Sequence, residues 1–228
     1  MVLRMAIGAI VVLPLLLWRG LLDDLKRLWL PMIWISLVNS AIPFVCYAFA
    51  VLHITTGLSS ILNATTPMLT ALISWLWLGS KLNPLRWIGA TIGFIGIALL
   101  VGEQAALKGH SAWLSIAAVL ACLLATTCYA IAGNVIKATM TDVHPWVMAF
   151  GTMFGAAVWL VIPTVLTWPT TTVTVQAWLS IAAAGVFCSA LALMLYYELM
   201  RRTDIALTAS VTYLIPLFAI VYGVLFLD

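Results

Sequence analysis

Residues 55–80 read TTGLSSILNATTPMLTALISWLWLGS, and residues 206–228 read ALTASVTYLIPLFAIVYGVLFLD. Each stretch is long and apolar enough for a transmembrane helix, which needs about 20 residues at a rise of about 1.5 Å each. Each also carries a proline and several polar side chains. Polar groups at membrane depth are costly against lipid, so we expect both stretches to face protein or a water-filled cavity. We place the working site at this pair of helices.

The composition indicates an all-α protein that crosses the membrane several times. Hydrophobic residues make up 65% of the chain and charged residues 7%, with a mean hydropathy of +1.18. A soluble domain carries about 25% charged residues. The long, continuous apolar runs exclude the short alternating segments of a transmembrane barrel. The net charge of +3 is better explained by cytoplasmic loops than by a nucleic-acid surface, so we expect a lipid bilayer and no nucleic acid as partner.

Eight apolar segments are predicted to be transmembrane helices. They span residues 2–18, 29–52, 55–78, 85–102, 112–134, 146–168, 176–200 and 205–227. The connections after residues 18, 78, 134 and 200 carry eight of the ten Lys and Arg residues, so they are predicted to be cytoplasmic. Eight helices then place both chain ends outside, which suggests that a first helix is missing.

The chain matches itself when it is shifted by 149 residues. The pairs that are least expected by chance are two of proline and one of tryptophan: Pro14 with Pro163, Pro67 with Pro216, and Trp29 with Trp178. Residues 1–79 therefore map onto residues 150–228. Five predicted helices separate each position from its mate. Because five is odd, the two copies cross the membrane in opposite directions, as in many secondary transporters with a site near the midplane.

We therefore divide the chain into a first repeat, residues 1–104, and a second, inverted repeat, residues 105–228. The helix at 85–102 has no second copy, and the helix at 112–134 has no earlier one. A complete molecule is expected to hold five helices in each repeat. The chain is thus predicted to be a truncated 5+5 inverted-repeat bundle that lacks the first and the last of ten helices.

These segments, with RMAIGAIVVLPLLLW (residues 4–18) and LRWIGATIGFIGIALLVG (residues 85–102), resemble the EamA family of the drug/metabolite transporter superfamily. The resemblance covers nearly the whole chain in the same order. It implies a multi-pass carrier of the inner (plasma) membrane that exports small metabolites, amino acids or drugs, often coupled to protons. One departure is Ser80 after Gly79, where the family usually has an acidic residue.

The candidate substrate-binding residues are polar or helix-breaking. Pro67 and Pro216 free the carbonyls four residues earlier, at Asn63 and Thr212. Such carbonyls can bind a solute, or neighbouring groups can satisfy them again. The complete candidate set is Asn39, Ser40, Asn63, Thr66, Pro67, Ser189, Tyr196, Thr212, Tyr213 and Pro216. The open alternative is that the hydroxyls bond back to their own helices and that the prolines serve packing alone.

Glu198 is the acidic residue that stands out, near the cytoplasmic end of the segment 176–200. It lies three and four residues before Arg201 and Arg202. Two roles are open: a helical ion pair at the membrane interface, or a carboxylate that couples transport to protons. Because no charged residue is predicted at mid-depth, we expect a neutral or zwitterionic solute.

Patterns for catalysis and for metal binding are missing from the sequence, so we expect neither an enzyme nor a cofactor. The four cysteines lie in apolar runs and are predicted to be small buried hydrophobes: Cys46, Cys122, Cys128 and Cys188. Glycines with small-xxx-small spacing should let helices approach closely, and a homodimer through such a face is a further alternative. These glycines are Gly89, Gly93, Gly96, Gly151 and Gly155.

The sequence supports secondary transport by alternating access as the leading function. Two alternatives stay open. The first is a non-transporting structural or regulatory membrane protein, or an inactive fragment of a transporter. The second is a channel, for which rings of carbonyls or charges would be expected.

Overall fold

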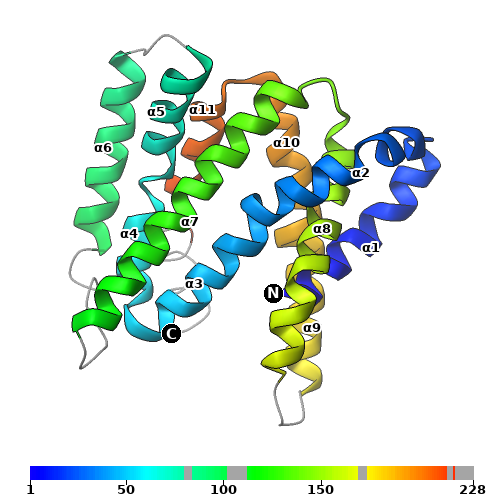
Figure 1. Ribbon diagram of the computed structural model, residues 1–228, viewed down its shortest axis with the longest axis horizontal. Coiled ribbons are helices and arrows are strands. Elements are labelled where there is room, and N and C mark those ends of the chain that lie inside the picture. Colours follow the sequence, from blue (N-terminus) through cyan, green and yellow to red (C-terminus); the bar gives the residue numbers. More distant parts are fainter. Residues whose placement is uncertain (80–83, 102–111, 169–173, 215–217, 219–228) are drawn as a thin grey trace. The chain divides into compact units, whose positions relative to one another are not determined.

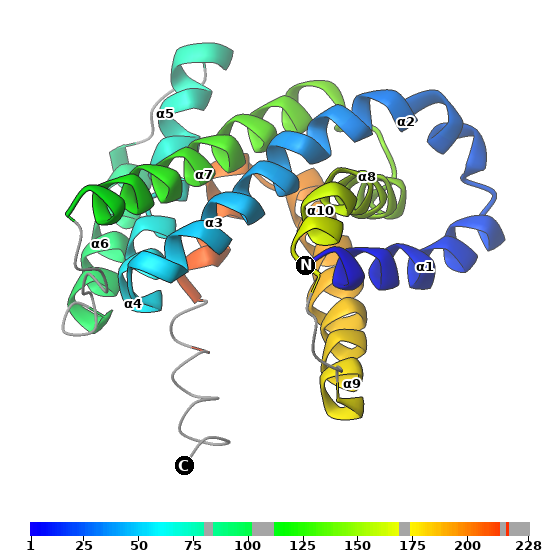
Figure 2. The ribbon, with the colours of Figure 1, turned by 60° about the horizontal axis from the view of Figure 1, so that its bottom comes forward.

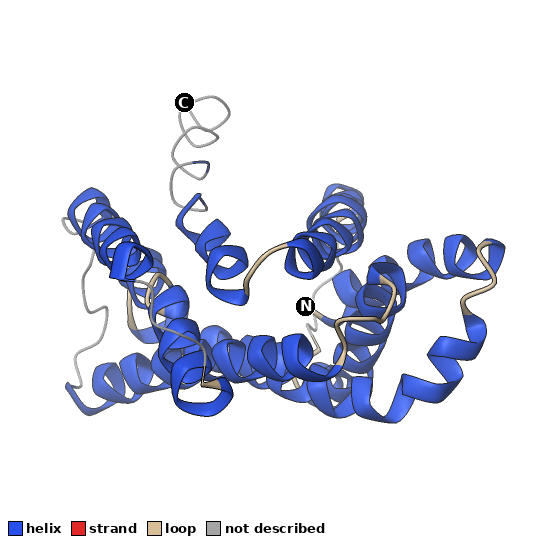
Figure 3. Ribbon diagram, turned by 90° about the horizontal axis from the view of Figure 1, so that it is seen from above, coloured by secondary structure: helices blue, strands red, loops and turns tan. Residues whose placement is uncertain are grey.

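The structure is a computed structural model that describes the whole chain except residues 80–83, 102–111, 169–173, 215–217 and 219–228. The described secondary structure is helical (Figure 3). The helices, labelled in Figure 1, are α1 (Val2–Trp18), α2 (Leu22–Ser36), α3 (Ile42–His53), α4 (Thr56–Asn63), α5 (Thr66–Leu78), α6 (Pro84–Val101), α7 (Ala112–Thr139), α8 (Pro145–Leu166), α9 (Val175–Ala183), α10 (Ala192–Arg202) and α11 (Ile205–Ala209). Two π-helical segments, η1 (Leu37–Ala41) and η3 (Ala184–Leu191), and a 3₁₀ segment, η4 (Ser210–Tyr213), interrupt them.

Five helical runs in the described residues are long and apolar enough to cross a membrane. They are Leu22–His53, Thr56–Leu78, Ala112–Thr139, Pro145–Leu166 and Val175–Arg202. Val2–Trp18 and Trp87–Gly96 are shorter apolar helices. These runs confirm the predicted all-α membrane fold. The last predicted segment, 205–227, lies partly outside the described residues.

The second predicted helix begins earlier in the structure than the sequence pattern indicated. Helix α2 starts at Leu22, so the polar stretch that we interpreted as a loop forms its first turns. Asp23 and Asp24 lie in the first turn, where the positive end of the helix dipole favours acidic side chains. Asp24 also lies 3.9 Å from Arg27 one turn later. The hydropathy pattern missed these turns because they are charged.

The chain forms two compact units. The first comprises Met1–Ala41 and Thr139–Arg202, and the second comprises Ile42–Ala138 and Thr203–Asp228. Each unit therefore combines segments from both predicted repeats. In the first unit α1 accompanies its repeat mate α8, and in the second α4 and α5 accompany their mate α11.

Helix α8 forms the centre of the first unit and contacts α1, α2 and α10 (Figure 2). Two of its glycines let α2 approach closely: a Cβ at Gly151 would overlap Met32, and a Cβ at Gly155 would overlap Ser36. This confirms the close helix approach predicted for this pair. The glycine face is covered by α2, so a homodimer through it would have to displace that helix.

In the second unit, α3, α4 and α7 share an apolar cluster built around Ala50, Ile54, Ala118 and Cys122. Helix α5 packs against α11 and α6. On α6, Gly93 lies against the ring of Tyr213. The close approach predicted for this helix is thus confirmed at Gly93.

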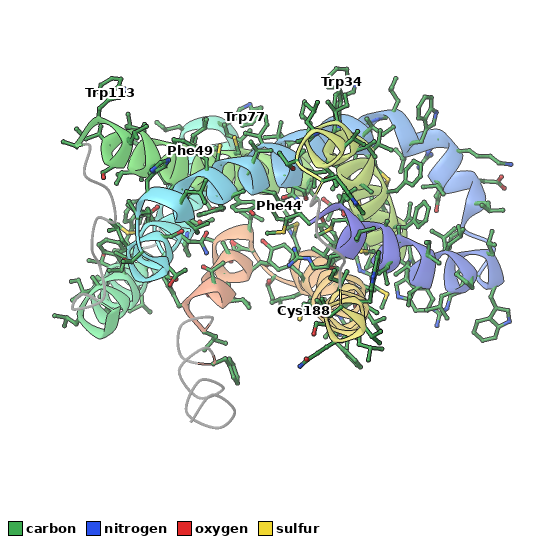
Figure 4. The ribbon with its side chains drawn as sticks, turned by 90° about the horizontal axis from the view of Figure 1, so that it is seen from below. Trp34, Phe44, Phe49, Trp77, Trp113 and Cys188 are labelled. Carbon is green, nitrogen blue, oxygen red and sulfur yellow. The ribbon has the colours of Figure 1, made fainter. Side chains whose placement is uncertain are left out.

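Large apolar side chains cover much of the outer surface of the described helices. Trp34, Trp77 and Trp113 point away from the ribbon in Figure 4 and are all exposed. Such a surface suits a lipid environment. The prediction of four buried cysteines is wrong for Cys188, which is exposed on η3. The helix that carries Cys188 also has apolar side chains on its exposed face. The hydropathy pattern therefore could not distinguish its exposed face from its buried face.

Candidate functional site

The first predicted helix break is present in the structure. Helix α4 ends at Asn63 and α5 begins at Thr66, with Pro67 in its first turn. The Asn63 carbonyl has lost its usual amide donor because residue 67 is proline. The Thr66 hydroxyl donates to that carbonyl instead, at 2.7 Å. The carbonyl is therefore satisfied within its own helix, so the open alternative of back-bonding applies at this position.

The repeat mate of this break lies at the end of α11. The α-helix stops at Ala209 and continues as the 3₁₀ segment η4, and the Thr212 hydroxyl donates to the Ala209 carbonyl at 2.9 Å. Tyr213 reaches α6, where its hydroxyl donates to the Ala90 carbonyl at 2.9 Å. Pro216 lies outside the described residues.

A polar cluster surrounds the break in the second unit. The Tyr47 hydroxyl donates to the Asn63 side-chain oxygen at 2.9 Å, and its ring stacks on Tyr129 with centroids 6.3 Å apart. The Asn134 amide on α7 donates to the carbonyl of Thr70, which lies further along α5, at 3.2 Å. The Asn134 side-chain oxygen is buried and has no hydrogen-bond partner among the described residues. We call Tyr47, Asn63, Thr66, Thr70 and Asn134 the second-unit polar cluster.

The first unit has its own polar cluster, with members on the two helices α8 and α10 and on both π-helical segments. The Asn39 amide on η1 donates to the Tyr197 hydroxyl at 3.4 Å, and Tyr197 donates to the Thr152 hydroxyl on α8 at 3.3 Å. Thr152 in turn donates to the Met148 carbonyl at 2.8 Å. Ser40 follows Asn39 on η1, and Ser189 lies on η3, the segment before α10. Both serines are buried. We call Asn39, Ser40, Thr152, Ser189 and Tyr197 the first-unit polar cluster.

Five members of these clusters lie outside the candidate set that the sequence predicts: Tyr47, Thr70, Asn134, Thr152 and Tyr197. Tyr197 was passed over in favour of its neighbour Tyr196, yet Tyr197 is the buried tyrosine that bonds Asn39 and Thr152. Tyr47 was also left out, although it is the repeat mate of Tyr196 and that match was a usable signal. Thr152 had no such signal, because its mate is Leu3.

Glu198 forms two ion pairs on the surface of α10. Its carboxylate lies 3.2 Å from the Arg201 guanidinium and 2.5 Å from that of Arg202. About a third of its side chain remains exposed, at 30%. The structure therefore contains the interfacial ion pair that was one of the two predicted roles.

Charged and aromatic residues gather at one end of the first unit. The Arg19 guanidinium lies 4.5 Å from the centre of the Trp146 ring. The His144 side chain caps α8 by accepting from the Trp146 amide at 3.3 Å. Burial, followed by the positive charges of Arg19 and Arg201, lowers the pKa of His144. Residues from the chain segments that follow residues 18, 134 and 200 thus meet at one end of this unit.

Comparison with known proteins gives the family. The model of the EamA-like transporter family matches residues 1–102 and 116–228. The uncharacterized transporter YvbV of Bacillus subtilis (strain 168) is 26% identical over 231 residues, which cover 98% of this chain and 72% of that protein. A solved structure described only as "Crystal structure of protein" has a TM-score of 0.83 at 21% identity, covering 98% of this chain and 76% of the other. At that identity the likeness is one of fold alone.

Proposed function

The chain belongs to the EamA-like transporter family, and from that premise we propose that it is a secondary carrier that exports small solutes by alternating access. The observation that carries the proposal is the pair of broken helices in the second unit. The break after Asn63 and the change to 3₁₀ geometry after Ala209 lie in repeat-related segments. Discontinuous helices in inverted repeats are where secondary transporters bind solutes and coupling ions.

The polar clusters define the kind of solute that the proposal requires. Both consist of amides, hydroxyls and phenols, which donate and accept hydrogen bonds without a net charge. A full charge on the solute would lose its hydration without gaining a counter-ion from these residues. We therefore propose a neutral or zwitterionic solute, such as a small metabolite, an amino acid or an uncharged drug. Its contacts in the second unit would come from the amide of Asn63 and from Thr212 and Tyr213, with Pro67 shaping the break. In the first unit, Ser40, Ser189 and Tyr196 stay candidate contacts.

The proposed setting is the inner membrane, with the segments after residues 18, 78, 134 and 200 in the cytoplasm. The excess of Lys and Arg in these segments supports this orientation. The meeting of three of them at one end of the first unit is consistent with it.

Transport can be tested with the purified chain in proteoliposomes. The vesicles would be loaded with a labelled panel of the twenty amino acids, uracil, adenine and ethidium, and efflux measured against protein-free vesicles. We expect efflux of at least one uncharged or zwitterionic member, and Asn63→Leu should reduce it at least about tenfold, since a buried polar contact is lost. Absence of both flux and binding for the whole panel would favour the structural or regulatory alternative.

We propose that Glu198 does not couple transport to protons. Exposed ion pairs of this kind mostly stabilise a helix end weakly. We expect Glu198→Gln to leave the pH dependence of efflux unchanged while lowering the stability of α10 slightly. The measurement is efflux from proteoliposomes at several external pH values. Loss of the pH dependence in this variant would restore Glu198 as the coupling carboxylate.

A further inference from the structure

The two π-helical segments are repeat mates. Residues 37–41, which form η1, map onto residues 186–190 when shifted by 149, and these lie within η3 at Ala184–Leu191. π-helical turns account for well under about 1% of residues in proteins and occur often at functional sites. The same rare geometry at matching positions of both repeats is therefore a property of the repeated unit and not of one local sequence.

The helix before η1 is held firmly against α8. The Trp159 indole donates to the Ile33 carbonyl at 2.9 Å, and Gly155 leaves just enough room for Ser36. After this point the contacts are looser. Asn39 donates to Tyr197 at 3.4 Å, where N–H···O bonds usually measure about 2.7–3.2 Å, and Tyr197 donates to Thr152 at 3.3 Å, where O–H···O bonds usually measure about 2.5–3.0 Å. By comparison, the Tyr47–Asn63 bond of the second unit measures 2.9 Å.

The mated segment η3 contains an unsatisfied group. The Ser189 hydroxyl is completely buried and has no hydrogen-bond partner among the described residues. α1 crosses η3 closely there, since a Cβ on Gly8 would come within 3.2 Å of the Ser189 Cβ and 3.1 Å of the Gly185 carbonyl. A buried hydroxyl without a partner costs free energy, so this arrangement of η3 does not satisfy all of its polar groups.

We propose that η1 and η3 are a matched pair of hinges, and that Tyr197 is the positioning residue. Tyr197 lies on α10, the helix that directly follows η3, and it bonds Asn39 on η1 and Thr152 on α8. The proposal rests on the proposed carrier function, because it assigns these segments to the conformational step of transport. When the two long bonds open, η1 and η3 rearrange and the Ser189 hydroxyl finds a partner. Such an element has two arrangements of similar energy, which is what a rocking carrier needs.

The hinge can be tested without any solute, by hydrogen exchange on the full chain in lipid nanodiscs. Tyr197→Phe removes only the hydroxyl that joins the two bonds, and Thr152→Val removes its acceptor at nearly constant volume. Both should speed amide exchange in residues 37–41 and 184–191, Tyr197→Phe by about fivefold because it removes both bonds. The double variant should match Tyr197→Phe, since the bond to Thr152 is already lost there. Tyr47→Phe, which removes a bonded hydroxyl in the second unit, is the matched control and should leave exchange in these two segments as in wild type.

Two results of this experiment would overturn the proposal. If both hinge segments exchange at the wild-type rate in the two variants, the bonds do not restrain these segments. Faster exchange throughout α8 as well would mean that Tyr197 serves general packing and not a hinge. Both variants remove the Tyr197–Thr152 bond. If one of them does not fold, the other still tests the proposal.

Transport by the same variants gives the second measurement. In the proteoliposome panel described above, Tyr197→Phe should change the maximal rate at least about threefold and leave KM within about twofold, since a hinge acts on a conformational step. A change in KM with an unchanged maximal rate would make Tyr197 a solute contact and overturn the hinge. If wild type transports no member of the panel, the carrier function fails, whereas the exchange experiment still decides the hinge by itself.

Discussion

At the scale of single residues, one hydroxyl determines the effect of Pro67. The proline leaves the Asn63 carbonyl without an amide donor, and the Thr66 side chain supplies the missing hydrogen bond at 2.7 Å. Thr65 forms a similar bond to the Leu62 carbonyl, also at 2.7 Å. That second carbonyl has a backbone donor as well, the Thr65 amide at 3.1 Å. The Thr66 hydroxyl therefore replaces a missing amide donor, whereas the Thr65 hydroxyl adds to one that is already present.

We predict that Thr66→Val lowers the free energy of unfolding by about 1 kcal/mol, because it leaves the partly buried Asn63 carbonyl unsatisfied. Thr65→Val should cost less than about 0.5 kcal/mol, since the Leu62 carbonyl keeps its amide donor. Unfolding titrations with SDS in mixed micelles would measure both variants against wild type. Equal losses in the two would show that Thr66 does not compensate for the proline.

At the scale of elements, α8 organises the first unit through small residues on one face and a histidine at its start. Gly151 and Gly155 place α2 in direct contact with its backbone. His144 caps the helix and lies near the charges of Arg19 and Arg201. The helix is thus fixed along its side by packing and at its end by polar contacts.

Gly155→Ala should lower the free energy of unfolding by about 1–3 kcal/mol, because the added methyl group overlaps Ser36 in a packed interface. Gly89→Ala on α6 is the matched control. No described atom lies within 4 Å of a Cβ at Gly89, so alanine there should be neutral or should stabilise the helix by up to about 1 kcal/mol. Thermal unfolding in detergent, followed by tryptophan fluorescence, would rank the two. The interpretation of the α2–α8 contact would be wrong if Gly155→Ala were as stable as Gly89→Ala.

The cap of α8 predicts a dependence of stability on pH. Burial and the nearby arginines lower the pKa of His144 below its ordinary value of 6.5, so the unfolded chain takes up a proton at a higher pH than the folded one. The contribution of His144 to the free energy of unfolding is constant at pH values above its ordinary pKa of 6.5. It is lost as the pH falls from there toward the lowered pKa of the folded state. His144→Asn replaces the capping ring nitrogen by an amide oxygen, which also accepts but does not titrate, so this part of the acid destabilisation should disappear. Melting temperatures from pH 8 to pH 5 would test this, and identical pH profiles for variant and wild type would contradict it.

At the scale of the whole molecule, the repeat and the compact units divide the chain differently. The sequence repeat separates residues 1–104 from residues 105–228, whereas each compact unit draws on both halves. Mates such as α1 and α8 share a unit. Neighbours in sequence can be separated, since the helical run Leu22–His53 passes from the first unit to the second after Ala41. The division into two sequence repeats stays a prediction about how the chain is built.

The predicted topology places the connection before α8 and the connection after it on opposite sides of the membrane, which can be tested. Thr141 lies in the connection before α8, and Thr174 caps α9 after it. In a chain whose native cysteines are replaced by serine, Thr141→Cys should react with an impermeant maleimide only in inverted vesicles, and Thr174→Cys only in intact cells. The reverse pattern would invert the predicted orientation, and labelling of both from one side would remove α8 as a membrane span.

The sequence alone determined that this protein is a helical membrane protein, and it located the helix break at Pro67, whereas the inverted repeat stays a prediction. These properties depend on hydropathy, on proline and on spacing along the chain, which need no knowledge of neighbours. Tertiary structure decided which polar groups act together: that Tyr197 and not Tyr196 joins Asn39 to Thr152, and that Thr66 satisfies the Asn63 carbonyl. In an apolar helix both faces look alike in sequence, so only packing determines which side chains meet inside.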